Sequence, residues 1–228
     1  MNQSLLHLLH LSDPTLPIGG FSHSNGLETY VQKGIVSDKD SAQLFIENML
    51  RNSVFYNDGS YLSLAFDAIA EENWDKIIEL DNHCNATKLP YEIRVASTKL
   101  GRRLIKIFSD LLTDKHIQTL DKKVKNKTIY GHYCIVFAII ANTLNISKKE
   151  TLAGFYYNSA AAFITNCVKL IPLGQQTGQQ ILFDIMPLIN QLAEDSLHPN
   201  EAKLGLCSIG FDIRAMQHET LYSRLYMS

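Results

Sequence analysis

The sequence predicts an all-α fold: a single-domain helical bundle of roughly eight to ten helices with a flexible C-terminal tail. Apolar residues recur at helical steps along most of the chain. No stretch of comparable length alternates between apolar and polar residues, as a half-buried strand would. Prolines and a capping-box pair stand where these helices are expected to begin and end. These three observations together favour helices without a sheet.

The segment 41–56 is expected to form a long amphipathic helix. Its apolar residues return every three to five positions, at Leu44, Phe45, Met49, Val54 and Phe55. The same spacing continues over residues 58–70. The Asn57-Asp58-Gly59 sequence between the two segments suits a break followed by a helix cap. We therefore expect two helices here, packed antiparallel.

Five further helices are expected, and the prolines support their limits. The expected ranges are 74–86, 91–112, 130–144, 148–170 and 174–193. Pro90 stands where a helix can begin, and Pro172 follows the end of another. Pro187 should kink or split the last range, because it removes a backbone donor. Ser147 and Glu150 have the spacing of a capping box.

Two regions lack the helical pattern. Lys115, Lys122, Lys123, Lys125 and Lys127 lie in a segment without an apolar period, which favours a solvated connector over a phosphate site. From residue 198 onward, proline and glycines interrupt the apolar spacing until the chain ends. We expect residues 1–228 to form one domain, with residues 198–228 as a partner-docking tail.

Composition excludes several classes of function. The 21 basic and 23 acidic residues give a formal charge of −2, which attracts neither nucleic acid nor anionic lipid. No apolar run approaches the roughly 18 residues of a membrane span. A secretory signal has basic residues before its apolar region, and the N-terminus has none before its apolar patch. Four scattered cysteines form no CxxC pair. The expected location is the cytoplasm, away from membranes.

Motifs of catalysis and metal binding are missing from the sequence. No GxxxxGK[ST], HExxH, GxSxG or GxGxxG pattern occurs. His7 and His10 could share a helical face, whereas His132 and Cys134 would point apart on a helix. We expect no catalytic residue, no intrachain metal site and no tightly bound cofactor.

Three segments combine polar groups with helix breakers or aromatic residues: 12–28, 169–180 and the tail. In the first two, proline and glycine either present a rigid loop or merely connect helices, and both interpretations stay open. The tail gathers polar and aromatic groups at a terminus too short to bury itself. Tyrosine and arginine are favoured in interfaces, so this segment is expected to order on docking.

These three segments together resemble the UreF family of urease accessory proteins. The family's LPxGxFSxSxGLE pattern is met over residues 16–28, its PLGQxxGQ pattern over 172–179, and its HExxxSRLxxS ending over 218–228. The resemblance implies an all-helical homodimer without a reaction of its own. It implies as partners UreD, also called UreH, the GTPase UreG and apo-urease. Nickel would be handled by this complex, in which the chain influences GTP hydrolysis by UreG.

The resemblance also suggests contact residues by position. Candidates for the UreD contact are His218, Glu219, Tyr222, Ser223 and Arg224, with Leu221 and Leu225 as apolar anchors. Candidates for UreG, or for the path toward it, are Glu28, Lys169, Gln175 and Gln179, which could instead cap helices or brace the core. His23 departs from a tyrosine that is frequent at its place, and residues 198–209 match no family pattern.

Two other functions compete with this interpretation. One is a helical enzyme whose pocket is built from His23, Glu28 and the glutamine turn at 175–180. The other is a nickel-storage protein. The enzyme requires titratable groups that converge in one concave pocket, whereas a scaffold requires exposed apolar patches.

Overall fold

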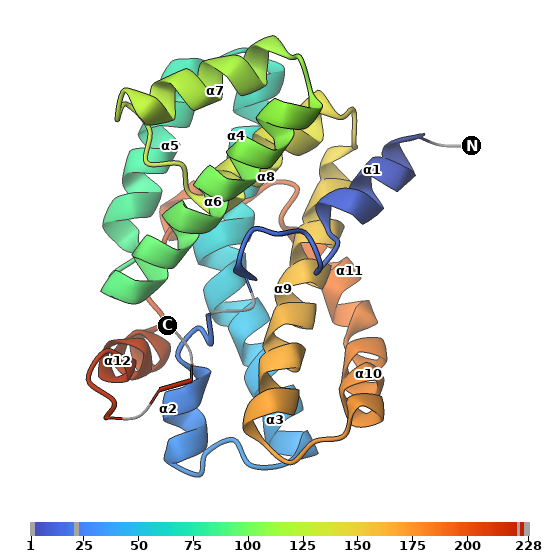
Figure 1. Ribbon diagram of the computed structural model, residues 1–228, viewed down its shortest axis with the longest axis vertical. Coiled ribbons are helices and arrows are strands. Elements are labelled where there is room, and N and C mark those ends of the chain that lie inside the picture. Colours follow the sequence, from blue (N-terminus) through green and yellow to red (C-terminus); the bar gives the residue numbers. More distant parts are fainter. Residues whose placement is uncertain (1–2, 21–22, 223, 226–228) are drawn as a thin grey trace.

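The computed structural model describes residues 3–20, 23–222 and 224–225, and these confirm the predicted all-α class: none of them lies in a strand (Figure 1). The first helices along the chain are α1 (Gln3–Leu11), α2 (Leu27–Gln32), α3 (Lys39–Asn48), a π-helix (Met49–Gly59), α4 (Ser60–Ala70), α5 (Trp74–Thr87) and α6 (Tyr91–Leu111). They are followed by α7 (Lys115–Lys125), α8 (Tyr133–Thr143), α9 (Lys148–Leu170), α10 (Gln175–Asp184), α11 (Met186–Asp195), a 3-10 turn (Glu201–Lys203) and α12 (Ile209–His218).

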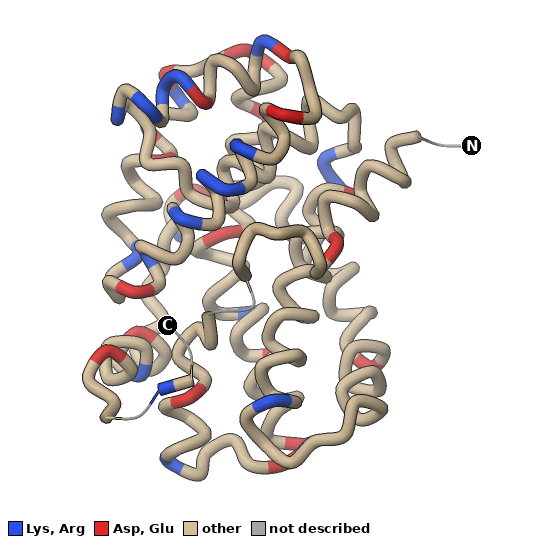
Figure 2. The backbone as a smooth tube through the Cα atoms, viewed as in Figure 1, with Lys and Arg blue, Asp and Glu red and all other residues tan. Residues whose placement is uncertain are grey.

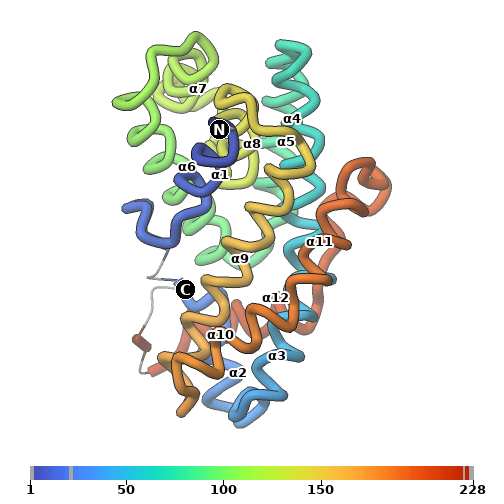
Figure 3. Tube along the Cα trace, turned by 90° about the vertical axis from the view of Figure 1, so that its right-hand side faces the viewer, coloured from blue at the N-terminus to red at the C-terminus, as the bar shows by residue number. Residues whose placement is uncertain are grey.

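Helix α8 forms the centre of the core. Every side chain from Cys134 to Ala141 is buried, because this helix is apolar around its whole circumference. It packs between α4 and α6 in the upper half of Figure 1. Helix α9 runs the length of the molecule, and α10 and α11 lie beside it (Figure 3). No described helix combines the length and the apolar character needed to traverse a bilayer.

The expected break at residues 57–59 is absent, so the predicted antiparallel pair is wrong. α3, the π-helix and α4 form one continuous helical rod from Lys39 to Ala70. Gly59 has helical angles, with φ −61° and ψ −41°, and any Cβ on it would collide with the Tyr156 hydroxyl. Asp58 forms an ion pair with Lys88 and does not cap a helix. The glycine here serves close packing between helices.

The lysine-rich segment is also helical, contrary to the expectation of a solvated connector. Asp114 caps α7 by accepting the backbone N–H of His116 at 2.7 Å. Ile117 and Leu120 are fully buried beneath the helix. Lys115, Lys122 and Lys125 are exposed, and Figure 2 shows in blue where the basic residues stand along the helix. Ile117, Leu120 and Val124 recur at steps of three and four, so the sequence does contain a short helical period among the lysines, and the expectation was wrong there.

Other predicted boundaries are confirmed. Helix α9 spans the expected range, and Ser147 and Glu150 form both hydrogen bonds of the capping box. Pro90 is the N-cap of α6. The segment near Pro187 is split into α10 and α11 at Ile185, as the missing proline donor predicts.

Candidate docking site at the C-terminal segment

The segment expected to be a flexible tail contains a packed helix. α12 lies against α2 and the start of α6 (Figure 1). Gly26 precedes α2 with a positive φ of 78°, and a Cβ placed on it would lie 3.3 Å from the Ala215 Cα. Glycine at this place therefore permits both the backbone turn and the close approach of α12.

His218, at the end of α12, is fully buried between two carboxylates. Its Nε2 lies 2.8 Å from Glu28 Oε2, and its Nδ1 lies 2.7 Å from Glu92 Oε2. Arg224 donates from Nη1 to Glu92 Oε1 at 2.6 Å, and the Leu225 backbone N–H donates to Glu28 Oε1 at 2.8 Å. We call Glu28, Glu92, His218 and Arg224 the glutamate clamp. It ties the C-terminal segment to α2 and α6.

Glu92 was not among the residues singled out from the sequence. It lies in the first turn of α6, where an acidic residue is ordinary because it favours the helix dipole. Nothing local indicates that it meets His218, which is 126 positions away. The predicted residue Glu219 lies at the same helix end and accepts the Tyr91 backbone N–H at 3.1 Å.

The remaining predicted tail residues differ in exposure. Tyr222 is fully exposed and Leu225 is 80% exposed, so both side chains are available to a partner. Leu221 is half-buried. Ser223 lies outside the described residues. The expectation that the terminus cannot bury itself is wrong for His218, because two distant glutamates enclose it.

Lys169, Gln175 and Gln179 lie elsewhere, at the end of α9 and in the first half of α10, on either side of the connection between these helices. All three are exposed, and in Figure 1 this connection lies on the other side of α2 from α12. Of the four residues considered for contacts to UreG, only Glu28 lies with the tail residues. The structure therefore places the candidate contact residues on two separate surfaces, and Glu28 lies on the surface of the tail residues instead of with the other UreG candidates.

An apolar face covers the outer side of α12. Ile209, Ile213 and Met216 are 68%, 47% and 42% exposed, and Leu206 just before the helix is 50% exposed. We call these four residues the α12 apolar face. Leu206 and Ile209 also line a groove of about 450 Å³. The groove walls include Ile35, Leu44, Phe45 and Phe211. The apolar surface thus continues from α12 to the α3 rod.

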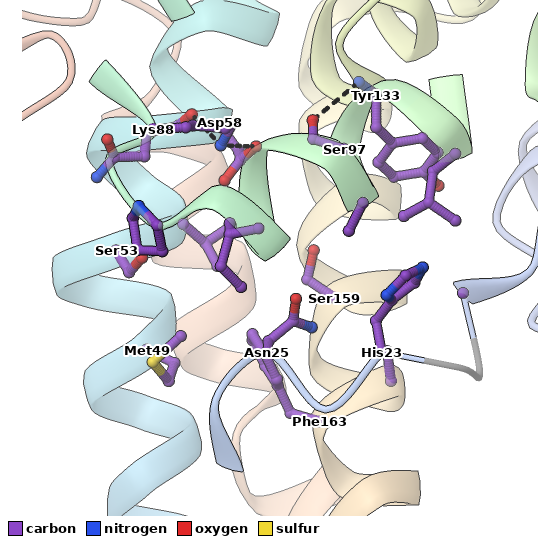
Figure 4. Close-up of a pocket in the computed structure, with 18 of the residues that line it drawn as sticks. His23, Asn25, Met49, Ser53, Asp58, Lys88, Ser97, Tyr133, Ser159 and Phe163 are labelled. Atoms are coloured by element: carbon purple, nitrogen blue, oxygen red, sulfur yellow. Dashed lines mark hydrogen bonds and ion pairs between the residues drawn. The ribbon is translucent and has the colours of Figure 1, made fainter. Parts of the chain in front are cut away.

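A second cavity, of about 150 Å³, lies between the α3 rod, α6 and α9 (Figure 4). His23, Asn25 and Ser159 line one part of it, and Asp58 and Lys88 line another. Burial lowers the pKa of His23, and Lys99 adds to this effect, which favours a neutral ring. Burial opposes the charge of Lys88, but the Asp58 carboxylate raises its pKa. The rest of the lining is largely apolar, with Ile18, Leu100 and Phe163 among its residues, so the cavity holds one internally balanced ion pair in a mostly apolar wall.

The residues expected to form an enzyme's pocket, namely His23, Glu28 and the glutamine turn, do not come together in this cavity. It includes His23 but neither Glu28 nor Gln175 and Gln179. Glu28 faces His218 in the clamp. Within the described ranges, no three His, Cys, Asp or Glu side chains are grouped as metal ligands. The two ring nitrogens of His218 face different glutamates and converge on no common point.

A helical frame with an exposed apolar helix face beside a tethered polar terminus defines a protein suited to binding other proteins. The UreF family model matches residues 36–186. Urease accessory protein UreF of Haemophilus influenzae is 50% identical over 231 residues, covering 100% of this chain and 98% of its own length.

Other relatives carry the same description. The protein of Actinobacillus pleuropneumoniae serotype 5b is 48% identical over 221 residues, covering 97% of each chain. That of Bacillus sp. strain TB-90 is 35% identical over 224 residues, covering 98% of this chain and 99% of its own. The chain belongs to the UreF family of urease accessory proteins.

Proposed function

We propose that this chain is a non-catalytic assembly protein for the nickel centre of urease, which binds UreD and thereby joins UreG and apo-urease. The observation that carries the proposal is the α12 apolar face, together with the exposed Tyr222 and Leu225 in the segment that follows α12. Burying one large aliphatic side chain contributes about 1.5–3 kcal/mol, so a few such residues can dominate an interface. This surface is our candidate contact for UreD.

We assign contacts with UreG to the surface around the connection between α9 and α10, formed by the end of α9 and the first half of α10. Lys169, Gln175 and Gln179 are exposed there and offer amides and one cation for hydrogen bonds across an interface. Because this surface lies apart from α12, UreD and UreG could be bound at the same time. Through this contact the chain would regulate GTP hydrolysis, while nickel would be handled by the whole complex without a tight site in this chain.

The compartment and the oligomeric state are part of the same proposal. The Cys84 and Cys134 sulfurs lie 4.0 Å apart without a bond, which suits a reducing compartment such as the cytoplasm. Leu5, Leu6 and Leu9 expose about half of each side chain along one side of α1 (50%, 48% and 60%). We propose that α1 contributes to a homodimer.

Co-purification with UreD tests the proposed docking surface. Ile213→Asp places a charge in the α12 apolar face and should reduce recovery of UreD at least tenfold, because a buried unpaired charge is strongly unfavourable. Leu111→Asp is the matched control, since Leu111 is a 57% exposed leucine at the far end of α6. Equal recovery with both variants would contradict the assignment of this surface.

A further inference from the structure

The buried ring of His218 has a hydrogen-bond arrangement that specifies its charge. Each ring nitrogen faces a glutamate oxygen, at 2.8 and 2.7 Å. An ionised carboxylate only accepts hydrogen bonds, so both nitrogens must donate, and only the imidazolium has two N–H groups. We infer that His218 is a buried imidazolium that latches the C-terminal segment, and that loss of its ring proton releases this segment.

The alternative of a protonated glutamate beside a neutral ring is disfavoured by the other oxygens. Glu28 Oε1 accepts the Leu225 backbone N–H, and Glu92 Oε1 accepts Arg224. Each glutamate therefore accepts an independent donor on the oxygen that does not face His218, and for Glu92 this donor is a charged guanidinium, which favours the ionised carboxylate. The two negative charges of Glu28 and Glu92 are balanced by the positive charges of His218 and Arg224.

The charged groups of α2 and α6 do not change the charge balance within the glutamate clamp. Glu28 is the charged residue of α2. On α6, Arg94 donates to the backbone carbonyls of Lys88 and Leu89. His23, which also faces Glu92, is held toward its neutral form by burial and by Lys99.

The charges of α12 itself are likewise engaged elsewhere. Asp212 accepts the Cys207 thiol at 2.9 Å, and Arg214 donates to the Gln217 amide oxygen at 3.0 Å. Glu219 accepts the Tyr91 backbone N–H. His218 is therefore the titratable donor that joins Glu28 to Glu92, and its proton decides whether the clamp is neutral.

Deprotonation changes both the charge and the hydrogen bonds. When the ring proton leaves to water, one nitrogen presents a lone pair to a carboxylate, and the clamp gains a net charge of −1. A buried carboxylate that loses a charged donor is unfavourable, so the contacts of Arg224 and Leu225 are weakened with it. Raising the pH should release the C-terminal segment from α2 and α6. This release does not depend on any partner.

The first test observes the ring and the segment together in the full chain. Nitrogen-15 NMR of histidine-labelled protein should show both His218 nitrogens protonated at pH 7. Hydrogen exchange of residues 219–222, 224 and 225, corrected for the intrinsic effect of pH, should accelerate at the same pH at which His218 loses its proton. A neutral ring at pH 7 with a protected segment would overturn the inference.

Matched variants separate the charge from the shape of the residue. His218→Gln should accelerate exchange of residues 219–222, 224 and 225 about tenfold or more at pH 7, with unchanged helical content by circular dichroism. Adding Glu28→Gln removes the unbalanced carboxylate and should restore most of the protection. His198→Gln, at an exposed histidine, should leave exchange unchanged.

Two results would contradict the latch. One is protection of the segment in His218→Gln equal to that of the wild-type chain. The other is no recovery in the His218→Gln/Glu28→Gln double variant, because charge balance requires it. Neither result bears on UreD binding, so failure of the latch and failure of the proposed function are distinguishable.

Discussion

The imidazole of His218 lies 2.8 Å from the carboxylate of Glu28, although 190 positions separate the two residues. This contact joins the last helix to the second, and Glu92 extends it to α6. The C-terminal segment is thereby held against the body of the bundle, while the α12 apolar face, Tyr222 and Leu225 stay exposed. The same residues that fix the position of the segment can also release it.

The buried ion pair between Lys88 and Asp58 should be important for stability. The two groups lie 2.8 Å apart, and their side chains are 4% and 21% exposed. Asp58→Asn leaves the ammonium without its counter-charge and should lower the free energy of unfolding by about 3 kcal/mol. Urea denaturation measures this. Lys88→Met in the same chain should recover most of the loss, and a further large loss would argue against the pair.

Gly59 should be intolerant of any side chain. Gly59→Ala forces Tyr156 to move, and should destabilise the fold by about 1–3 kcal/mol, because the core is closely packed. Thermal unfolding is the measurement. Gly210→Ala is the control, since no atom lies within 4 Å of the added Cβ there. Equal effects of the two substitutions would disprove the packing explanation.

His132 should make the fold sensitive to acid. Burial lowers its pKa to about 3, with Lys88 adding to the effect. The hydroxyl of Ser97, 3.1 Å from Nδ1, can donate to the neutral ring. Since the unfolded chain binds this proton more readily, stability present above about pH 6.5 is lost as the pH falls toward 3.

The protonation of His132 should lower the free energy of unfolding by up to about 5 kcal/mol over that whole pH range. Urea denaturation at several pH values gives the slope. His132→Gln should be less stable at pH 7 but should show a smaller loss on acidification. A slope identical to that of the wild-type chain would show that other groups are responsible.

The exposed leucines of α1 should hold two copies of the chain together. Light scattering of the wild-type protein should give twice the chain mass of 25.7 kDa. Leu5→Glu/Leu9→Glu should give the single mass, because charges in an apolar interface are unfavourable. Leu111→Glu, at a leucine of similar exposure, should remain dimeric. A dimeric double variant would place the interface elsewhere.

GTP hydrolysis should belong to UreG alone. The chain carries no phosphate-binding lysine motif, so the purified protein should release no phosphate from GTP. Added to UreG and UreD, it should change the rate of hydrolysis. Gln175→Ala/Gln179→Ala should reduce that change by a factor of about 3 or more while leaving UreD recovery intact. Hydrolysis by the isolated chain would refute the first part.

Helix positions were largely predictable because their causes are local. The Ser147–Glu150 box acts over three residues, and Pro187 acts on its own backbone. Local interpretation failed at Gly59, where the partner is the Tyr156 hydroxyl. The Asn-Asp-Gly sequence is typical of a turn, but a lysine 30 positions away satisfies Asp58 inside a helix.

The sequence by itself determined the helical class, most of the helix limits and, through three ordered motifs, the family. Only the tertiary structure decided that the C-terminal segment is held against α2 and α6. Glu92 and His218 interact across 126 positions, and no local pattern of residues predicts such a pair. The tertiary structure also decided which side of α12 stays exposed, since that depends on the positions of α2 and α6. Local spacing specifies each helix, and its partners depend on how distant segments pack.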